Sequence, residues 1–361
     1  MEYGEIREKH ARIRQKKRRN LILKAVIALA VVVIVVIGIK CISTLVLKEN
    51  NDNQTGDDQN VVATKEAISE DVTDSDKEDP ASTSEPEETL YTVTDIKAGK
   101  ALPKSVVSTN GVLIDAESGK VIAQKGCTKR ITPASMTKIL TVYVAAKNIK
   151  DLDKHLKDKV KITREITDYT YSNGCSIVGF DVDEKVTVQD LFYGTILPSG
   201  ADAALALAEY VAGSQDDFVK LMNAELKELG IDKTTHFTNC VGLYDENHYS
   251  TVNDIAIILH AAVQDEFCQK VLNARKYTTT KNSKHKDGLL ISNWFLRRIE
   301  DKYTKGEVLY AKTGYVVQSG SCAASLATDS AGKEYICVTV GSESSWRCIY
   351  DHVDIYSKYL E

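Results

Sequence analysis

Apolar and polar positions divide this 361-residue chain into four stretches of different character. Residues 1–20 are polar and strongly basic, whereas residues 21–47 are almost wholly aliphatic. Residues 48–90 are polar again and now acidic. From residue 91 to residue 361, short apolar runs alternate with polar turns, which is the pattern of a packed globular part.

The aliphatic stretch predicts one membrane-spanning helix. Its uninterrupted part, residues 25–39, would extend about 22 Å at about 1.5 Å per residue, whereas the hydrocarbon core of a bilayer is about 30 Å thick. Lys24 and Lys40 flank this part. Lysines near the ends of a span reach the interface, so residues 21–47 are long enough. We expect this segment to be a signal anchor.

The flanking charges predict its orientation. Basic residues precede the span and acidic residues follow it, which keeps residues 1–20 in the cytoplasm as a tail and requires no nucleic-acid partner. A cleaved signal peptide is the alternative. No convincing small-x-small cleavage site follows Ile39, and Lys40 before Cys41 does not suit lipoprotein processing. We therefore favour an uncleaved anchor.

The acidic stretch, residues 48–90, predicts a disordered linker. It combines many Asp and Glu residues with Ser, Thr, Asn and Gln. So few apolar groups cannot offset the entropy lost on ordering. The stretch also accounts for the formal net charge of −5, which therefore says little about the globular part.

The globular part begins and ends with predicted strands. A hairpin is predicted at residues 111–124, a helix follows from residue 132, and residues 150–275 are largely helical. Three strands and a final helix follow, at residues 308–313, 321–327, 334–340 and 344–360. This order predicts an antiparallel sheet built from both ends of the domain, with a helical insertion.

Ser135 and Lys138 stand at the predicted start of the first helix. Thr132 suits the N-cap and Pro133 the first helical position. A lysine three residues after a serine lies on the same helix face. Because a serine nucleophile needs a base, and burial or a second cation readily lowers the pKa of a lysine, the pair predicts a nucleophile and its general base.

The spacing alone is weak evidence, because the chain contains it twice more. Ser283 and Lys286 lie in a polar run that predicts an exposed loop, and Ser330 and Lys333 lie in a predicted turn between two strands. Neither pair opens an amphipathic helix. We treat both as chance matches.

Two further motifs follow along the chain. Ser199 lies in a turn before the helix predicted over residues 202–211, where it could equally be an ordinary N-cap. Lys312, Thr313 and Gly314 end a predicted strand. An ammonium and a hydroxyl together can bind a carboxylate, and a glycine lets a substrate backbone approach closely.

No convincing metal site is visible in the sequence. Seven of the eight cysteines lie beyond the aliphatic stretch at irregular spacings without a C-x-x-C pair. Their number is odd, so disulfides and a reduced set both remain open. His236, His248 and His260 are scattered, and no H-E-x-x-H motif occurs, which argues against a metallopeptidase. We expect neither a metal nor another cofactor.

The order Ser-x-x-Lys, Ser-x-x, Lys-Thr-Gly is close to the signature of penicillin-binding proteins and class A β-lactamases. Over residues 105–345 the chain closely resembles the low-molecular-mass penicillin-binding proteins that are D-alanyl-D-alanine carboxypeptidases, a family of serine peptidases. The resemblance implies a β-lactamase/transpeptidase-like α/β fold of the α+β type, with an antiparallel sheet flanked by helices and a mainly helical subdomain. The matching stretches are residues 132–141, 197–209, 242–251 and 311–315.

The resemblance also implies roles for the motif residues. Ser135 would be the acylated nucleophile, Lys138 its general base, and Ser199 a proton relay to the leaving D-alanine. The backbone N–H groups of Ser135 and Tyr315 would form the oxyanion hole. Lys312 would bias the pKa of Lys138.

Substrate binding is implied for the third motif. Lys312 and Thr313 would hold the terminal carboxylate of a peptidoglycan stem peptide that ends in D-Ala-D-Ala, and Gly314 would belong to the same segment. Removal of the last D-alanine would act in peptidoglycan synthesis, and β-lactams would acylate Ser135. The resemblance then places residues 91–361 outside a bacterial cell membrane, anchored in the lipid bilayer by the N-terminal helix.

One departure from the family pattern leaves alternatives open. The second motif usually ends in asparagine, where this chain has Ala201. Activity could therefore be lowered, and a catalytically weak wall-binding homologue is one alternative. A class A-like β-lactamase is another, with Glu246 as the nearest candidate for the glutamate that its deacylation requires.

Overall fold

The computed structural model describes residues 90–361. The predicted cytoplasmic tail, transmembrane helix and nearly all of the predicted linker lie outside this range, and they stay predictions. Among the described residues, no helix is both long enough and apolar enough to cross a bilayer.

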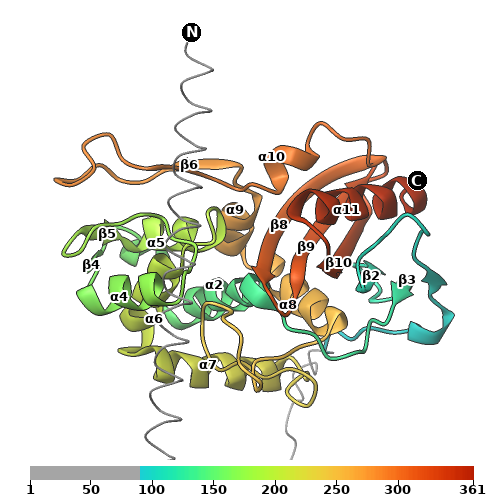
Figure 1. Cartoon of the computed structure of the whole chain (residues 1–361), viewed down its shortest axis with the longest axis horizontal. Coiled ribbons are helices and arrows are strands. Elements are labelled where there is room, and N and C mark those ends of the chain that lie inside the picture. Colours follow the sequence, from blue (N-terminus) through green and yellow to red (C-terminus); the bar gives the residue numbers. More distant parts are fainter. Residues whose placement is uncertain (1–89) are drawn as a thin grey trace, which may run out of the picture. The chain divides into compact units, whose positions relative to one another are not determined.

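A six-stranded sheet forms one side of the described part, and most of the helices lie beside it (Figure 1). The strand order is β1-β3-β2-β10-β9-β8, and every neighbouring pair is antiparallel except the short pair β1–β3. Strands from the two ends of the domain meet at the β2–β10 pair, so the predicted sheet is confirmed. The strands are β1 Lys100–Ala101, β2 Asn110–Asp115, β3 Val121–Lys125, β8 Gly306–Val316, β9 Gly320–Asp329 and β10 Glu334–Ser342.

Helices cover both faces of this sheet. Neighbouring residues of β10 serve different cores: Val338 packs in the core that includes α2 (Thr137–Asn148) and α8 (Val252–Gln264), whereas Cys337 packs in the core that includes α11 (Ser345–Tyr359). Successive side chains of a strand point to opposite faces. A strand covered on both sides is therefore apolar over most of its length, as β10 is from Tyr335 to Val338.

The helix α2 passes through the middle of the helical part and packs against α5, α6, α7, α8 and α9. It is buried on nearly all sides, and a helix that is apolar all round belongs in a core. The predicted helical region is confirmed. Its helices are α3 Leu152–His155, α4 Arg164–Ser172, α5 Val188–Ile196, α6 Ala201–Ala212, α7 Gln215–Glu228 and α9 Glu266–Asn273.

Five short strands and one short helix were not predicted, and the first of these strands is β1. The strands β4 (Lys159–Lys161) and β5 (Lys185–Thr187) pair within the helical part, and β6 (Lys276–Thr278) and β7 (Leu290–Ser292) form a hairpin beside it. The helix α10 (Leu296–Ile299) follows β7.

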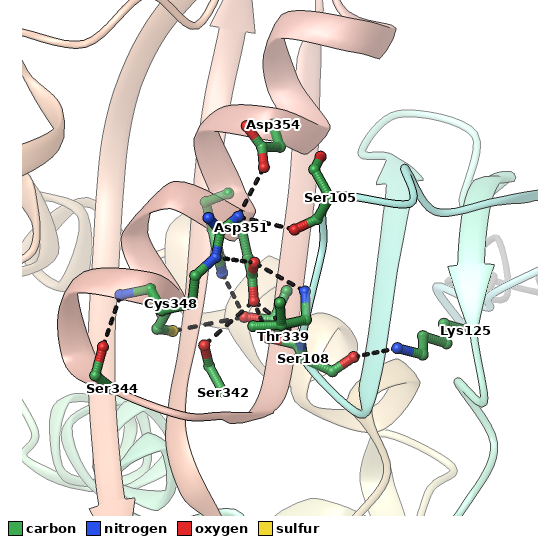
Figure 2. A network of polar contacts seen from close by, with 12 residues as sticks. Ser105, Ser108, Lys125, Thr339, Ser342, Ser344, Cys348, Asp351 and Asp354 are labelled. Atoms are coloured by element: carbon green, nitrogen blue, oxygen red, sulfur yellow. Dashed lines mark hydrogen bonds and ion pairs between the residues drawn. The ribbon is translucent and has the colours of Figure 1, made fainter.

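A buried carboxylate fastens α11 to the sheet (Figure 2). Asp351 is fully buried and accepts hydrogen bonds from the backbone N–H groups of Val107 and Ser108, at 3.1 and 3.0 Å. It also accepts from Ser342 Oγ at 3.3 Å and from Arg347 Nε at 2.9 Å. One side chain thus joins α11, the end of β10 and the segment that leads into β2.

Candidate active site

The structure brings Ser135 and Lys138 together. Ser135 lies in a 3-10 turn, η2 (Ala134–Met136), which leads directly into α2. Lys138 Nζ donates to Ser135 Oγ at 3.1 Å and to the carbonyl oxygen of Val241 at 2.6 Å. Because α2 is buried on nearly all sides, the core fixes the position of Lys138.

The start of this helix differs from the prediction. Neither Thr132 nor Pro133 caps it: the 3-10 turn comes first, and α2 begins at Thr137. Ala134 has a left-handed backbone with φ of 48°. Gly242 lies against it so closely that a Cβ there would be 2.0 Å from the Ala134 carbonyl oxygen. This tertiary contact, and not a capping side chain, shapes the turn that carries Ser135.

Burial brings the pKa of Lys138 closer to neutral pH, which a general base requires. Only 2% of the residue is exposed. The loss of solvation disfavours the ammonium and lowers the pKa of Lys138 to about 8. We expected Lys312 to bias this pKa, but burial is its main cause. The repulsion between the two ammonium groups acts instead on Lys312. Burial and the positive charge of Lys138 together hold the pKa of Lys312 well below its ordinary value.

Lys312 and Ser199 form a second pair beside the first. Lys312 lies on β8, is buried, and its Nζ donates to Ser199 Oγ at 2.8 Å and to the carbonyl oxygen of Thr313 at 2.7 Å. Ser199 lies in the turn before α6 with φ of 62°, a strained conformation for a residue with a side chain. The structure therefore places Ser199 in contact with the third motif and not at a helix cap, since Gly200 holds the cap position.

A cleft of about 1070 Å³ joins the motifs. Ser135, Lys138, Ser199, Thr313 and Tyr315 all line it, while Lys312 lies beneath and reaches it through Ser199. The side chain of Tyr315 is 65% exposed at its edge. Every predicted site residue is thus in or directly below one cleft.

Gly314 lies against the turn that carries Ser135, and its expected contact with a substrate backbone stays a prediction. A Cβ on Gly314 would lie 2.8 Å from the backbone nitrogen of Ser135 and 2.8 Å from Cys322 Sγ. The group that approaches Gly314 closely is therefore the turn that carries the nucleophile. Glycine lets the edge strand β8 and the Ser135 turn lie in contact.

Asp202 positions one wall of the cleft and was missed in the sequence analysis. It is buried, and its carboxylate accepts from the backbone N–H groups of Val178 and Gly179 at 2.9 and 3.1 Å. Burial raises its pKa. These bonds hold the segment 173–180, four residues of which line the cleft. An acidic residue in the first turn of α6 was the available signal.

Ala201 lies at the meeting point of this wall and α6. It is buried, it lines the cleft, and its backbone N–H donates to the carbonyl oxygen of Ser176 at 2.8 Å. Cys175, half-buried, lines the same part of the cleft. The position where the family usually has an amide therefore offers a methyl group, with a thiol nearby.

The remaining candidates lie away from this cleft. Glu246 is exposed and lines a neighbouring hollow. His248 is buried against Phe237, and burial lowers its pKa to about 3, while His260 stacks on Tyr91. The seven described cysteines are free. The two chance matches are in a loop and a turn, as predicted.

One group in the described part could hold a metal ion on distance alone. Ligand atoms of Asp181, Glu184 and His285 lie within 4.8 Å of one another. Glu184 Oε1 already accepts from Asn282 Nδ2 at 2.7 Å and contacts His285 Nδ1 at 2.9 Å. These bonds tie the β6–β7 loop to the helical part, and the group does not line the cleft.

Several D-alanyl-D-alanine carboxypeptidases are similar in sequence to this chain. D-alanyl-D-alanine carboxypeptidase DacF of Bacillus subtilis is 33% identical over 213 residues, which cover 59% of this chain and 52% of DacF. DacC of Escherichia coli is 38% identical over 163 residues, which cover 45% of this chain and 40% of DacC. The chain thus spans about half the length of the curated relatives it matches.

Solved structures and a family model give the same assignment. The Streptomyces K15 DD-transpeptidase superposes with a TM-score of 0.62 at 27% identity, covering 72% of this chain and 99% of that one. Penicillin binding protein 5 from Haemophilus influenzae gives 0.61 at 29% identity, covering 69% of each. The fold is β-lactamase/transpeptidase-like. The sequence model of the D-alanyl-D-alanine carboxypeptidase family matches residues 97–344, and the chain belongs to this family.

Proposed function

We propose that this protein is a serine-type D-alanyl-D-alanine carboxypeptidase, which removes the terminal D-alanine from peptidoglycan stem pentapeptides and is acylated by β-lactams. The observation that carries the proposal is the contact of 3.1 Å between a buried lysine amine, Lys138 Nζ, and Ser135 Oγ, in a cleft shared with the Lys312–Ser199 pair. Family membership gives the substrate class.

Acylation begins with Ser135. Its Oγ attacks the carbonyl carbon of the penultimate D-alanine while the hydroxyl proton passes to the neutral amine of Lys138. The carbonyl oxygen becomes an oxyanion, and the backbone N–H groups of Ser135 and Tyr315 stabilise it. The C–N bond then breaks. The leaving amine takes the proton that Lys138 had accepted, relayed through the Ser199 hydroxyl, which Lys312 holds in place, and Lys138 is neutral again.

Hydrolysis returns the enzyme to its starting state. Lys138 takes a proton from water, and the water oxygen attacks the ester carbonyl. The bond to Ser135 Oγ breaks, and Lys138 returns its proton to that oxygen. The products are a tetrapeptide and D-alanine, and no cofactor takes part.

The third motif recognises the end of the substrate. The ammonium of Lys312 and the hydroxyl of Thr313 each donate a hydrogen bond to the terminal carboxylate. Both bonds are charge-assisted, because the acceptor is ionised. A carboxylate at this point also offsets the repulsion between Lys312 and Lys138, so substrate binding favours the charged form of Lys312. Ala201 removes one amide contact, and Ser199, which handles the proton, is retained.

The alternative of a class A-like β-lactamase has less support. Its deacylation needs a carboxylate that activates a water beside the acylated serine. Glu246 is exposed outside the cleft that contains Ser135. A catalytically weak homologue stays an alternative because of Ala201. A measurement of substrate turnover distinguishes it from an active carboxypeptidase.

Two substrates separate these functions. The full-length protein is incubated with a fluorescent penicillin and with a pentapeptide that ends in D-Ala-D-Ala. We expect stable acylation by the first and release of D-alanine from the second. Rapid penicillin turnover would identify a lactamase, and acylation without D-alanine release would reject the carboxypeptidase. Ser135→Ala abolishes both signals, whereas Ser283→Ala, with the same spacing to a lysine, leaves both unchanged.

We further propose that residues 21–47 cross the bacterial cell membrane once, with residues 91–361 outside it. The support is the apolar length and the basic-to-acidic change across the segment. In bacterial cells whose cell wall and any outer membrane have been removed, added protease should then degrade the domain and leave an epitope tag at residue 1 protected. Protection of the whole chain would reject this orientation.

A further inference from the structure

A second hollow, here called the polar pocket, adjoins the catalytic cleft. Its volume is about 810 Å³. Tyr244 and Gln318 line both the polar pocket and the cleft, so the two are continuous. Three charged residues line only the polar pocket: Arg130, Asp245 and Glu246.

These three charges are available to a ligand. The Arg130 guanidinium lies 3.5 Å from the ring centre of Tyr249 and donates to the backbone carbonyl of Glu246, which fixes its position. Asp245 Oδ1 accepts from the N–H of Asn247 at 2.7 Å. Among residues 90–361, no ion pair includes Arg130, Asp245 or Glu246. The polar pocket thus offers one cation and two anions that no other charge neutralises.

The direction of the substrate decides which part of it reaches this pocket. With its terminal carboxylate at Lys312 and Thr313 and its reacting carbonyl at the N–H of Tyr315, the substrate runs antiparallel to β8, toward Gln318. The strand β8 ends at Val316, and Gln318 lies in the turn that follows it, before β9. The residue before D-Ala-D-Ala therefore lies at the entrance of the polar pocket.

We propose that the polar pocket binds the side chain of that residue and selects one that ends in both an ammonium and a carboxylate, as in meso-diaminopimelate. Arg130 pairs with the carboxylate, and Asp245 and Glu246 pair with the ammonium. A lysine side chain supplies the ammonium alone and leaves Arg130 without a partner. The inference rests on the proposed function for the position of the D-Ala-D-Ala end.

Binding to an inactive protein tests this selectivity without turnover. Calorimetry on the full-length Ser135→Ala protein compares three pentapeptides, L-Ala-γ-D-Glu-X-D-Ala-D-Ala, in which X is meso-diaminopimelate, its side-chain carboxamide, or L-lysine. We expect the first to bind about tenfold more tightly than the other two, which corresponds to about 1.4 kcal/mol. The carboxamide peptide isolates the charge, since it keeps the length and the ammonium.

Variants in the same protein assign the effect to a residue. Arg130→Gln lowers the affinity for the diaminopimelate peptide to that of the lysine peptide and leaves the lysine peptide unchanged. Arg130→Lys keeps part of the preference. Glu246→Gln weakens all three peptides together, because all carry the ammonium. Lys129→Gln removes an exposed neighbouring charge that does not line the pocket and alters none of them.

Equal affinity for the three peptides, or a preference that survives Arg130→Gln, would overturn the inference. Failure of the proposed function gives a different result. In that case the protein with Ser135 intact releases no D-alanine from any peptide, whether or not the Ser135→Ala protein distinguishes them.

Discussion

At the residue scale, Lys138 combines an amine that is almost fully buried with a pKa lowered to about 8. The base must be neutral to accept the Ser135 proton, so activity requires a pH near or above that pKa. At pH 7 only about one molecule in ten then holds the neutral amine. We predict that the acylation rate rises through pH 7 to 9 by about tenfold, measured with a fluorescent penicillin.

The control for this pH dependence is Lys138→Arg. An arginine stays charged at every pH of the assay, so the variant should lose acylation by about a thousandfold or more. Its pH profile should no longer rise near pH 8. A rate that is flat from pH 6 to 9 in the unmodified protein would show that Lys138 is not the titrating base.

Gly314 gives a second prediction at this scale, because Gly314→Ala forces a Cβ to within 2.8 Å of the Ser135 nitrogen. The Ser135 turn must shift, and a displacement of the nucleophile of about 1 Å costs about a hundredfold in rate. We expect the acylation rate to fall by that factor. Gly332→Ala is the comparison, since its φ of 82° makes it strained but nothing lies within 4 Å. It should lower the melting temperature and leave the acylation rate unchanged.

The site residues that the sequence predicted are those whose chemistry lies in the side chain. Ser135, Lys138 and Lys312 were identifiable from residue type and spacing. The carbonyl of Val241, which binds Lys138, was not, because a backbone acceptor is the same in every residue. The left-handed φ of Ala134 was also invisible, since it results from contact with a distant loop.

At the scale of elements, the long strands and helices were predictable because their burial is periodic. The strands β8, β9 and β10 extend the predicted ranges by a few residues at their ends. The short pairs β4–β5 and β6–β7 have three residues in each strand and mix exposed with buried positions, so no periodicity marks them. Three residues are too few to show the alternation of buried and exposed positions by which a strand is predicted from a sequence.

The attachment of α11 to the sheet gives the prediction for this scale. Asp351→Ala leaves several buried donors without an acceptor, which costs about 2–4 kcal/mol in the free energy of unfolding. Urea denaturation measures this loss. Asp354→Ala is the matched control, because its carboxylate is 30% exposed and contacts the same arginine, Arg347. It should cost less than about 1 kcal/mol. Equal losses would show that the buried network does not fasten α11.

At the scale of the whole molecule, the described residues 90–361 hold every residue that lines the cleft. A fragment of residues 83–361 should therefore be acylated by penicillin as fast as the full chain. Under the proposed anchoring, the fragment should leave the membrane fraction that contains the full chain. A fragment that stays in that fraction would mean that the domain itself binds the membrane.

A shorter fragment tests whether residues 83–101 contribute to the stability of the domain. Tyr91 stacks on His260 of α8, with ring centres 3.5 Å apart, and Lys100–Ala101 adds the edge strand β1 beside β3. Residues 102–361 lack both contacts and keep every residue of the cleft. We expect this fragment to unfold at a lower urea concentration than residues 83–361 and, while folded, to be acylated at the same rate. Equal midpoints would show that residues 83–101 only connect the domain to what precedes it, whereas a slower acylation would mean that this segment supports the Ser135 turn through α8.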